Sequence, residues 1–289
     1  MTSIVIPAHN EGRVIGRLLD ALLAGAEAED TDIVVVCNGC TDDTARVAGA
    51  RGPRVRVVEI PTPSKHTALR VGDEHARGFP RLYVDADVVV GAADVRALAG
   101  ALAGSPGLLA AAPDREIPLT GCAWPVRAYY GVWQLLPAVR EGLFGRGVIA
   151  VSQEGHARIA ALPPLMADDL AASQAFAPGE RCVVETARVV VRPPRTWSDL
   201  VRRRIRAATS SVEFERYQAS RRAGAPGAAP PSARTGTADL RALLRDRPRL
   251  LPGVVVFVAA ALAARRGSRK AIRSGDFSTW LRDESSRRN

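Results

Sequence analysis

Cysteine is scarce in this sequence, and its scarcity excludes a scaffold held together by disulfides. The 289 residues contain four cysteines, Cys37, Cys40, Cys122 and Cys182, too few to build the framework of a chain this long. Cys37 and Cys40 are spaced as Cys-x-x-Cys, but no second pair accompanies them. We expect half-buried thiols at a strand end, with zinc or redox use as the minor alternative.

The sequence also lacks a recognisable leader and the composition of a nucleic-acid-binding surface. No basic segment followed by an apolar stretch precedes the first apolar run at residues 3–7, so we expect a cytoplasmic protein. The net charge of +10 is uneven: 22 Lys and Arg stand against 8 Asp and Glu from Val190 onward, and 18 against 22 before it. Few aromatic residues are interleaved with these C-terminal charges. We therefore expect no nucleic acid, and a peripheral contact with anionic phospholipid at the inner face of the membrane.

Short apolar runs alternate with segments of helical periodicity along the first part of the chain. The runs lie at residues 3–7, 32–36, 55–60 and 81–84, and the segments between them carry apolar residues at helical spacing. This alternation predicts an α/β domain with a mostly parallel central sheet flanked by helices. Thr41 is the expected N-cap of the second helix. Further strands are predicted at residues 107–112, 148–152 and 182–191.

Two aspartates end the fourth of these runs. Residues 81–90 are Arg-Leu-Tyr-Val-Asp-Ala-Asp-Val-Val-Val, so a buried strand delivers Asp85 and Asp87 to the carboxyl edge of the sheet, where open α/β sheets bind ligands. Hard divalent cations take oxygen ligands from one or two carboxylates together with substrate phosphates. The pattern predicts a metal and diphosphate site, although the same triplet also occurs by chance in solvated turns.

The middle of the chain holds an aromatic cluster, a glycine-rich loop and a second acidic pair. Residues 124–133 contain two of the four tryptophans and two of the four tyrosines, and a helix packed on the sheet and a sugar or lipid platform remain equal alternatives. Three glycines within residues 142–147 indicate backbone that approaches a ligand. Asp168 and Asp169 follow two prolines and are the natural companions of the first acidic pair.

The last third of the chain is basic and predicted to be largely helical. A helix opens at Trp197, residues 221–237 have the composition of a flexible linker, and residues 239–245 form a short helix. The apolar run at residues 250–264 is about fifteen residues long, below the about 20 of a spanning helix. Three alternatives remain open for this run. In order of preference, they are a helix packed in the core, a helix at the membrane surface and a spanning helix.

Taken in order, these motifs resemble those of glycosyltransferase family 2, the inverting sugar-nucleotide transferases with the GT-A fold. Residues 4–11 are similar to the family's opening strand, with Pro7, Asn10 and Glu11 in their usual places. Residues 36–44 resemble its Asp-Asp-Gly-Ser-Thr-Asp segment. Asp85 to Asp87 resemble the Asp-x-Asp motif, and Asp168 with Asp169 the later Glu-Asp pair.

The resemblance implies a division of the chain and a set of site residues. A GT-A (Rossmann-like) domain is expected at residues 1–211, with a nucleotide-sugar half at 1–112 and an acceptor half at 113–211. A basic helical extension follows at 212–289. Asp169 is the implied catalytic base with Asp168 in reserve, and Mg²⁺ or Mn²⁺ is held by Asp87 directly with Asp85 behind it. The full donor-binding set is Pro7, Ala8, Asn10, Glu11, Asn38, Lys65, Asp85, Ala86, Asp87, Arg203 and Arg206.

Some of these assignments have ordinary structural alternatives. Lys65 and either Arg203 or Arg206 are predicted to bind the diphosphate, since guanidinium offers bidentate geometry to phosphate oxygens, but each could equally be a solvated cation. Asn38 stands where the family usually has an aspartate, so an amide would meet the base, and uridine and guanosine donors both remain open. Arg203 and Arg206 lack the Gln and Trp of the Gln-x-x-Arg-Trp signature, which indicates transfer of one sugar at a time.

Together these features predict a metal-dependent inverting glycosyltransferase. It would move one sugar from a nucleotide-sugar, with UDP favoured, to a hydroxyl of a small molecule, lipid or glycan. A sugar-phosphate nucleotidyltransferase shares the fold but needs a glycine-rich opening loop, of which residues 8–13 are a poor version. A non-catalytic protein that binds a membrane or nucleic acid through its basic tail is the other alternative.

Overall fold

The computed structural model describes residues 1–25, 31–222 and 235–274, and in this part of the chain all named strands belong to one sheet. The sheet has seven strands in the order β3-β2-β1-β4-β6-β5-β7. Only β6 runs against its neighbours, because its pairings with β4 and β5 are antiparallel and the other pairings are parallel. The predicted α/β class with a mostly parallel sheet is confirmed. The strands are β1 (Thr2–Ala8), β2 (Thr31–Asn38), β3 (Val55–Ile60), β4 (Arg81–Val84), β5 (Ala110–Glu116), β6 (Val148–Val151) and β7 (Arg181–Val190).

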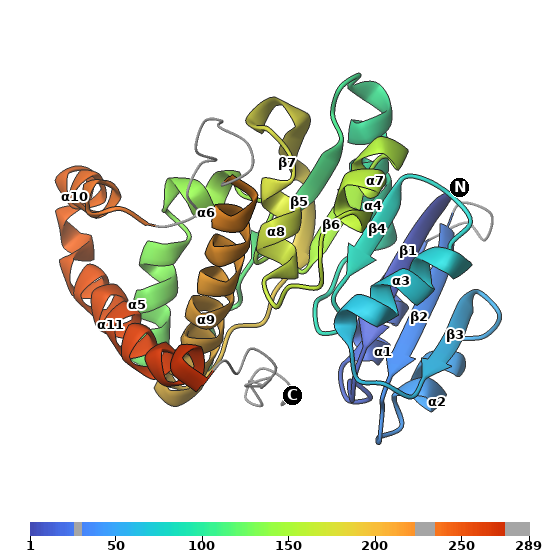
Figure 1. Cartoon of the computed structure of the whole chain (residues 1–289), viewed down its shortest axis with the longest axis horizontal. Coiled ribbons are helices and arrows are strands. Elements are labelled where there is room, and N and C mark those ends of the chain that lie inside the picture. The colour runs from blue at the N-terminus through green and yellow to red at the C-terminus, as the bar shows by residue number, and fades with distance from the viewer. Residues whose placement is uncertain (26–30, 223–234, 275–289) are drawn as a thin grey trace. The chain divides into compact units, whose positions relative to one another are not determined.

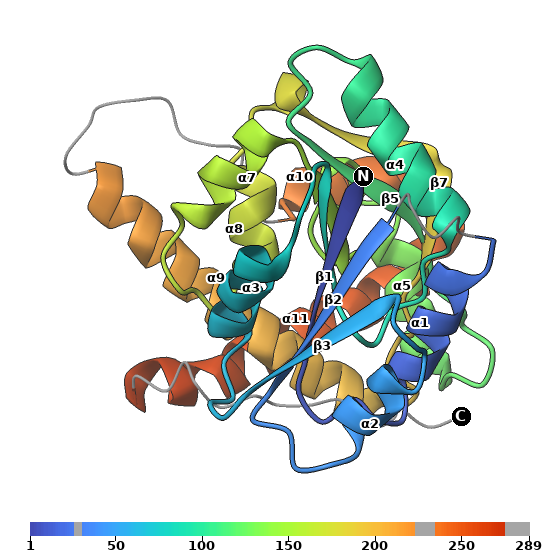
Figure 2. The same cartoon turned by 90° about the vertical axis from the view of Figure 1, so that its right-hand side faces the viewer.

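The whole sheet belongs to one of two compact units. This sheet unit comprises residues 1–117, 145–162 and 175–192. On one face of the sheet lie α1 (Ile15–Leu23), α2 (Thr44–Gly49) and α4 (Ala92–Gly104), and on the other lie α3 (Lys65–His75) and α7 (Gln153–Ala160), as Figure 2 shows. Because helices cover both faces, β1 is buried along its entire length and β2 at every position after the first.

Two apolar layers hold these helices on the sheet. Ile4 and Ile6 of β1 belong to one buried cluster with Leu18, Leu19 and Leu98 of the covering helices. On the opposite face, alternate residues of β2 pack against α3 in a smaller cluster. Each fully buried aliphatic side chain contributes about 1.5–3 kcal/mol to folding. The sheet is therefore a rigid base for the loops at its ends.

The second compact unit is made of helices. This helical unit comprises residues 118–144, 163–174 and 193–289. Its described elements are α5 (Trp124–Trp133), α6 (Pro137–Glu141), α8 (Asp168–Gln174), α9 (Trp197–Arg222), α10 (Thr237–Asp246) and α11 (Leu251–Ser274). α11 packs along both α9 and α5 (Figure 1). Tyr129 of α5 stacks on Phe257 of α11, with ring centroids 5.2 Å apart. The aromatic cluster therefore forms a helix, but Tyr129 packs on α11 and not on the sheet, as one alternative expected.

One local prediction needs correction, and another falls mostly outside the described residues. Thr41 is not an N-cap: α2 begins at Thr44 and Asp43 occupies the N-cap position, while the backbone N–H and hydroxyl of Thr41 both donate to the side chain of Asn10. The apolar run of residues 250–264 lies in α11, which continues through its basic neighbours to Ser274. Pro252 does not interrupt α11, because it lies in the first turn, where no backbone N–H is needed. Most of the predicted linker, residues 223–234, lies outside the described residues.

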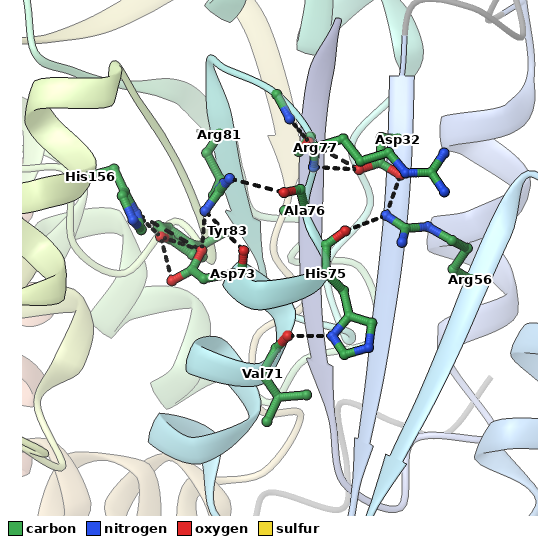
Figure 3. Close-up of polar contacts among 12 residues, drawn as sticks. Asp32, Arg56, Val71, Asp73, His75, Ala76, Arg77, Arg81, Tyr83 and His156 are labelled. Carbon is green, nitrogen blue, oxygen red and sulfur yellow. Dashed lines mark hydrogen bonds and ion pairs between the residues drawn. The ribbon is translucent and has the colours of Figure 1, made fainter.

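A closed polar network lies at the amino ends of the strands (Figure 3). Asp32, at the start of β2, accepts hydrogen bonds from the Ser3 hydroxyl, from the backbone N–H of Arg77 and from Arg56 at 2.6 Å. Asp73 of α3 accepts from Arg81 and from the Tyr83 hydroxyl, both at 2.9 Å. His156 of α7 lies 2.8 Å from the same hydroxyl. These partners join α3 and α7 to the edge of the sheet opposite the candidate site.

Candidate functional site

The carboxyl ends of three neighbouring strands bring the predicted donor-binding residues of the sheet unit to one edge. The order β2-β1-β4 places the loops after these strands side by side. Asn10 and Glu11 follow β1, Asp85 and Asp87 follow β4, and Asn38 is the last residue of β2. This is the edge where open α/β sheets bind ligands.

Lys65 and Asp85 form an ion pair at this edge. The Lys65 ammonium donates to Oδ1 of Asp85 at 2.7 Å. Lys65 is the first residue of α3, whose start is fixed by Ser64, an N-cap whose hydroxyl accepts the backbone N–H of Thr67. The side chain of Asp85 is still 38% exposed, so a ligand can reach it. The sequence left open whether Lys65 belongs to the site or is a solvated cation. The structure places it at the acidic motif.

A glycine loop supports Asp85 from behind. The backbone N–H of Asp85 donates to the carbonyl of Gly147 at 2.8 Å. Gly147 has φ +66°, and a Cβ there would lie 2.5 Å from Cγ1 of Val88. The neighbouring Arg146 is buried and donates to the carbonyl of Pro113 at 2.9 Å, while its burial lowers its pKa to about 10. The glycine-rich segment therefore approaches the acidic motif itself and fixes its backbone.

Two arginines that the sequence analysis did not single out accompany Asp87. Val89 and Val190 exchange backbone hydrogen bonds of 3.1 and 2.8 Å, which ties the segment after Asp87 to the end of β7 and to Arg192 just beyond it. Burial lowers the pKa of Arg17 on α1, the charge of Arg192 lowers it further, and the carboxylate of Asp87 opposes both. Like charges are thus gathered beside a carboxylate. The position of Arg192 just after the carboxyl end of a predicted strand was the available signal.

The two asparagines of the site hold loops together. Asn38 is buried and its Nδ2 donates to the carbonyl of Ala8 at 2.9 Å. Asn10 adopts the left-handed conformation, φ 53°, and its Oδ1 accepts the backbone N–H of Thr41 at 2.7 Å. These contacts set the shape of the loop after β1. Contact of either asparagine with a nucleotide stays a prediction.

The remaining residues predicted on the first strand and the acidic motif are largely enclosed. Pro7, Ala8, Glu11 and Ala86 are all buried. The backbone N–H of Glu11 donates to the Thr44 hydroxyl at 2.8 Å. These residues shape the edge of the sheet from within, and any ligand would meet mainly their backbone.

The nearby Cys-x-x-Cys pair consists of free thiols, as all four cysteines are. Cys37 is buried at the end of β2, and burial raises its pKa to about 12, with the neighbouring Cys40 adding to the shift. The thiolate is the form that binds metals and attacks disulfides. The environment of Cys37 therefore disfavours both activities.

The carboxylates of the acidic motif suit a hard divalent cation. Among the described residues, no group of three or more His, Cys, Asp or Glu side chains could hold a metal ion. Asp85 and Asp87 offer oxygen atoms and are both partly exposed. Mg²⁺ and Mn²⁺ accept one or two carboxylates and complete their shells with phosphate oxygens and water. The donor set fits such an ion and does not resemble a closed zinc site.

The other predicted residues belong to the helical unit. Asp168 and Asp169 form the first turn of α8, and Asp169 is exposed. The segment before them is tied down, because the backbone N–H of Met166 donates to Glu213 of α9 at 2.8 Å.

The predicted diphosphate-binding arginines Arg203 and Arg206 lie on α9, and both are partly exposed. The adjacent Arg204 lies over the ring of Tyr129 at 5.9 Å. Burial raises the pKa of Tyr129 to about 12, which the charges of Arg204 and Arg203 oppose. The environment of Arg203 thus includes the buried tyrosine of α5.

The mostly parallel seven-stranded sheet with its flanking helices is the GT-A type of domain. The model of the family described as glycosyl transferase family 2 matches residues 3–142. This match, over just under half of the chain, is to the family that the order of the motifs predicted.

Known proteins place this match in context. A 4,4'-diaponeurosporenoate glycosyltransferase from Staphylococcus aureus is 38% identical over 90 residues, which cover 30% of this chain and 24% of that protein. The match thus spans about a quarter of that relative. Mannosyltransferase PcManGT from Pyrobaculum calidifontis, solved with GDP-Man and Mn²⁺, is 20% identical with a TM-score of 0.60 over 95% of this chain and 82% of that one. Glucosyl-3-phosphoglycerate synthase from Mycobacterium tuberculosis is 21% identical with a TM-score of 0.50 over 69% of this chain and 74% of that chain. The two structures share the fold.

Proposed function

We propose that this chain is a metal-dependent inverting glycosyltransferase that moves one sugar from a nucleotide-sugar, with UDP favoured, to an acceptor hydroxyl. The observation that carries the proposal is the gathering of charge at the end of β4. Asp85 contacts Lys65 there, Asp87 lies within the electrostatic reach of Arg17, and Arg17 lies within that of Arg192. A nucleotide diphosphate with its cation matches both signs of charge.

The donor half of the reaction needs stabilisation of a leaving diphosphate. As the bond between sugar carbon 1 and the phosphate oxygen breaks, negative charge accumulates on the diphosphate. Asp87 would hold Mg²⁺ or Mn²⁺ directly and Asp85 would stand behind it, and the ion when bound neutralises part of that charge. Lys65 is the first cationic side chain we assign to the phosphates, with Arg17 and Arg192 beside it. Arg203 and Arg206 stay predicted diphosphate ligands from the helical unit.

The acceptor half needs a base. The acceptor hydroxyl loses its proton to a carboxylate as its oxygen attacks carbon 1, and direct displacement inverts that carbon. We assign this role to Asp169, with Asp168 in reserve, because the pair matches the Glu-Asp motif of the family. The exposure of Asp169 leaves its carboxylate accessible to an acceptor.

The nucleotide and acceptor follow from weaker signals. The fold of this chain is also that of a protein solved with GDP-Man and Mn²⁺ and of one solved with UDP-Glc, Mn²⁺ and phosphoglyceric acid. We rank UDP-sugars first and GDP-sugars second. The acceptor is a hydroxyl of a small molecule, lipid or glycan, and the protein would work in the cytoplasm.

The test is a donor screen followed by a matched pair of variants. The melting temperature of the full chain is measured with UDP-, GDP- and dTDP-sugars, with and without Mn²⁺. We expect one donor class to raise it only with Mn²⁺, and its slow hydrolysis to release nucleoside diphosphate. Lys65→Met should lower that turnover about a hundredfold, in line with loss of one charged transition-state contact.

The control variant is Arg70→Met, which removes a positive charge from an exposed position of the same helix. It should leave turnover within about twofold. If no nucleotide-sugar raises the melting temperature with Mn²⁺, the proposed donor site is wrong. Release of pyrophosphate from a nucleoside triphosphate and a sugar phosphate would instead identify a nucleotidyltransferase.

A further inference from the structure

α11 has one face committed to packing inside the helical unit. Val254, Phe257, Ala260 and Ala264 are buried along this face. Glycines allow close contact at both ends of the helix. A Cβ at Gly253 would lie 3.0 Å from a side-chain atom of Val132 in α5 and 3.2 Å from a backbone oxygen. At Gly267 it would lie 2.4 Å from Ile205 in α9. α11 is therefore packed along its length.

The opposite face of α11 is apolar and exposed. Leu251, Val255, Val258 and Leu262 are 55%, 60%, 39% and 50% exposed. Their spacing of four, three and four residues places them in one row on a helix. Soluble helices normally present polar side chains on the face turned away from their packing partners. We call these four residues the apolar row.

Positive charges lie at both ends of the apolar row. Arg247 and Arg249 precede it and are exposed, and Arg265, Arg266 and Arg269 follow it and are exposed. Residues 247–274 contain no Asp or Glu. An apolar stripe between clusters of arginine complements a surface that is apolar inside and anionic at its rim. A phospholipid leaflet with acidic headgroups has that composition.

Packing decides between an in-plane and a spanning helix. By length and composition alone, residues 248–269 could cross a membrane, and they are the one such segment in the described part of the chain. The apolar row covers about 16 Å at 1.5 Å per residue, about half of a hydrocarbon core. A spanning α11 would also carry its close partner α9, with Arg202, Arg203 and Arg204, into the bilayer at a high cost in free energy.

We propose that the apolar row and its flanking arginines form a membrane-binding face that lies in the plane of an anionic phospholipid leaflet. The row would sit at the boundary between headgroups and acyl chains, with the arginines against lipid phosphates. The sequence predicted a membrane contact through the basic C-terminal part of the chain, and this proposal assigns that contact to named side chains. It does not depend on the proposed sugar transfer.

The test is binding of the full chain to vesicles, followed by flotation. One vesicle set is phosphatidylcholine, and the other is phosphatidylcholine mixed with phosphatidylglycerol. We expect binding to the anionic set, weakened by salt. The V255S/L262S variant should lower the partition coefficient about tenfold or more through lost apolar burial. R265Q/R266Q/R269Q should lower it about a hundredfold on anionic vesicles, at about fivefold per arginine.

A matched control tests whether vesicle binding depends on this face or only on the net charge of the chain. R46Q/R70Q/R96Q removes the same charge from exposed positions of the sheet unit and should stay within about threefold of the unchanged chain. The proposal is overturned if the chain does not float with anionic vesicles, or if the serine variant floats as well as the unchanged chain. It is also overturned if the unchanged chain is a dimer in solution that the serine variant converts to a monomer, because the row would then be an interface between copies.

Discussion

The two edges of the sheet contain the same kinds of charged residue but expose them to different degrees. At the amino edge, Asp32 is 5% exposed and its acceptors are used by a hydroxyl, a backbone N–H and Arg56. At the carboxyl edge, Asp85 is 38% exposed, and the positive charge of Arg192 lowers the pKa of Arg17. Opposite charges pair at both edges, but the amino edge encloses its carboxylate whereas the carboxyl edge leaves its carboxylate open to solvent.

This difference separates stability from chemistry. A carboxylate whose partners all come from the chain gains nothing from a ligand, and its removal leaves buried donors without acceptors. A partly exposed carboxylate stays open to a cation, and the repulsion between Arg17 and Arg192 is relieved when an anionic ligand arrives. The amino edge should therefore respond to substitution in folding, and the carboxyl edge in turnover.

The largest expected effect is on turnover. Asp87→Asn should lower kcat of the sugar-nucleotide reaction about a thousandfold, because a neutral amide supplies less charge to the cation and to the arginines. Its melting temperature should change little, since Asp87 is partly exposed. Initial rates with saturating donor and Mn²⁺, together with thermal unfolding, check both statements.

The amino edge provides the matched control. Asp73→Asn makes the same chemical change in a side chain that accepts from Arg81 and Tyr83. It should lower the melting temperature while the folded enzyme keeps kcat within about threefold. Equal losses of turnover in the two variants would remove the distinction between the edges.

The parts of this arrangement that local patterns encode were predictable. Continuous apolar runs identified the strands of the parallel half, and the position of Asp85 and Asp87 just after such a run placed them at the ligand-binding edge. Arg192 was missed because it reaches that edge through the bridge between Val89 and Val190, a pairing across about a hundred residues. Arg17 was missed because it lies on α1 and not at the end of a strand. The insertion of antiparallel β6 between β4 and β5 is equally non-local. Side chains that hold loops, such as Asn38, resemble ligand-binding residues until their partners are known.

The next effect is on stability at the amino edge. Asp32→Asn should lower the free energy of unfolding by about 3 kcal/mol, because Arg56 loses a buried counter-ion and one donor of the cluster loses its acceptor. Urea titration of the full chain measures it. Asp20→Asn is the control, since Asp20 pairs with Arg51 at an exposed position and should cost less than about 1 kcal/mol.

A smaller effect on folding is expected at the carboxyl edge. Gly147→Ala places a Cβ against Val88 at a position with positive φ, which should cost about 2 kcal/mol. Because Gly147 supports the backbone of Asp85, donor affinity should fall with it. Gly100→Ala, at a helical position with open space around the Cβ, is the control and should not destabilise the chain. Unchanged affinity in Gly147→Ala would show that the loop is not needed to hold the acidic motif.

The smallest effect is a pH dependence carried by His156. Burial lowers the pKa of His156 and the charge of Arg81 adds to this, while the carboxylate of Asp73 opposes them; Tyr83 and the Phe79 ring complete its surroundings. As the pH falls through the ordinary histidine pKa of about 6.5, the unfolded chain takes up a proton that the folded chain still refuses, so stability decreases toward acid. Above that pH both states hold neutral imidazole and the contribution is flat.

His156→Gln should therefore make the decline of melting temperature between about pH 7 and pH 5 shallower. The exposed His75, which donates to the Val71 carbonyl, is the control, and His75→Gln should keep the original slope. Parallel slopes for the unchanged chain and His156→Gln would mean that the amino edge accepts the proton without loss, and that it is less closed than its hydrogen bonds indicate.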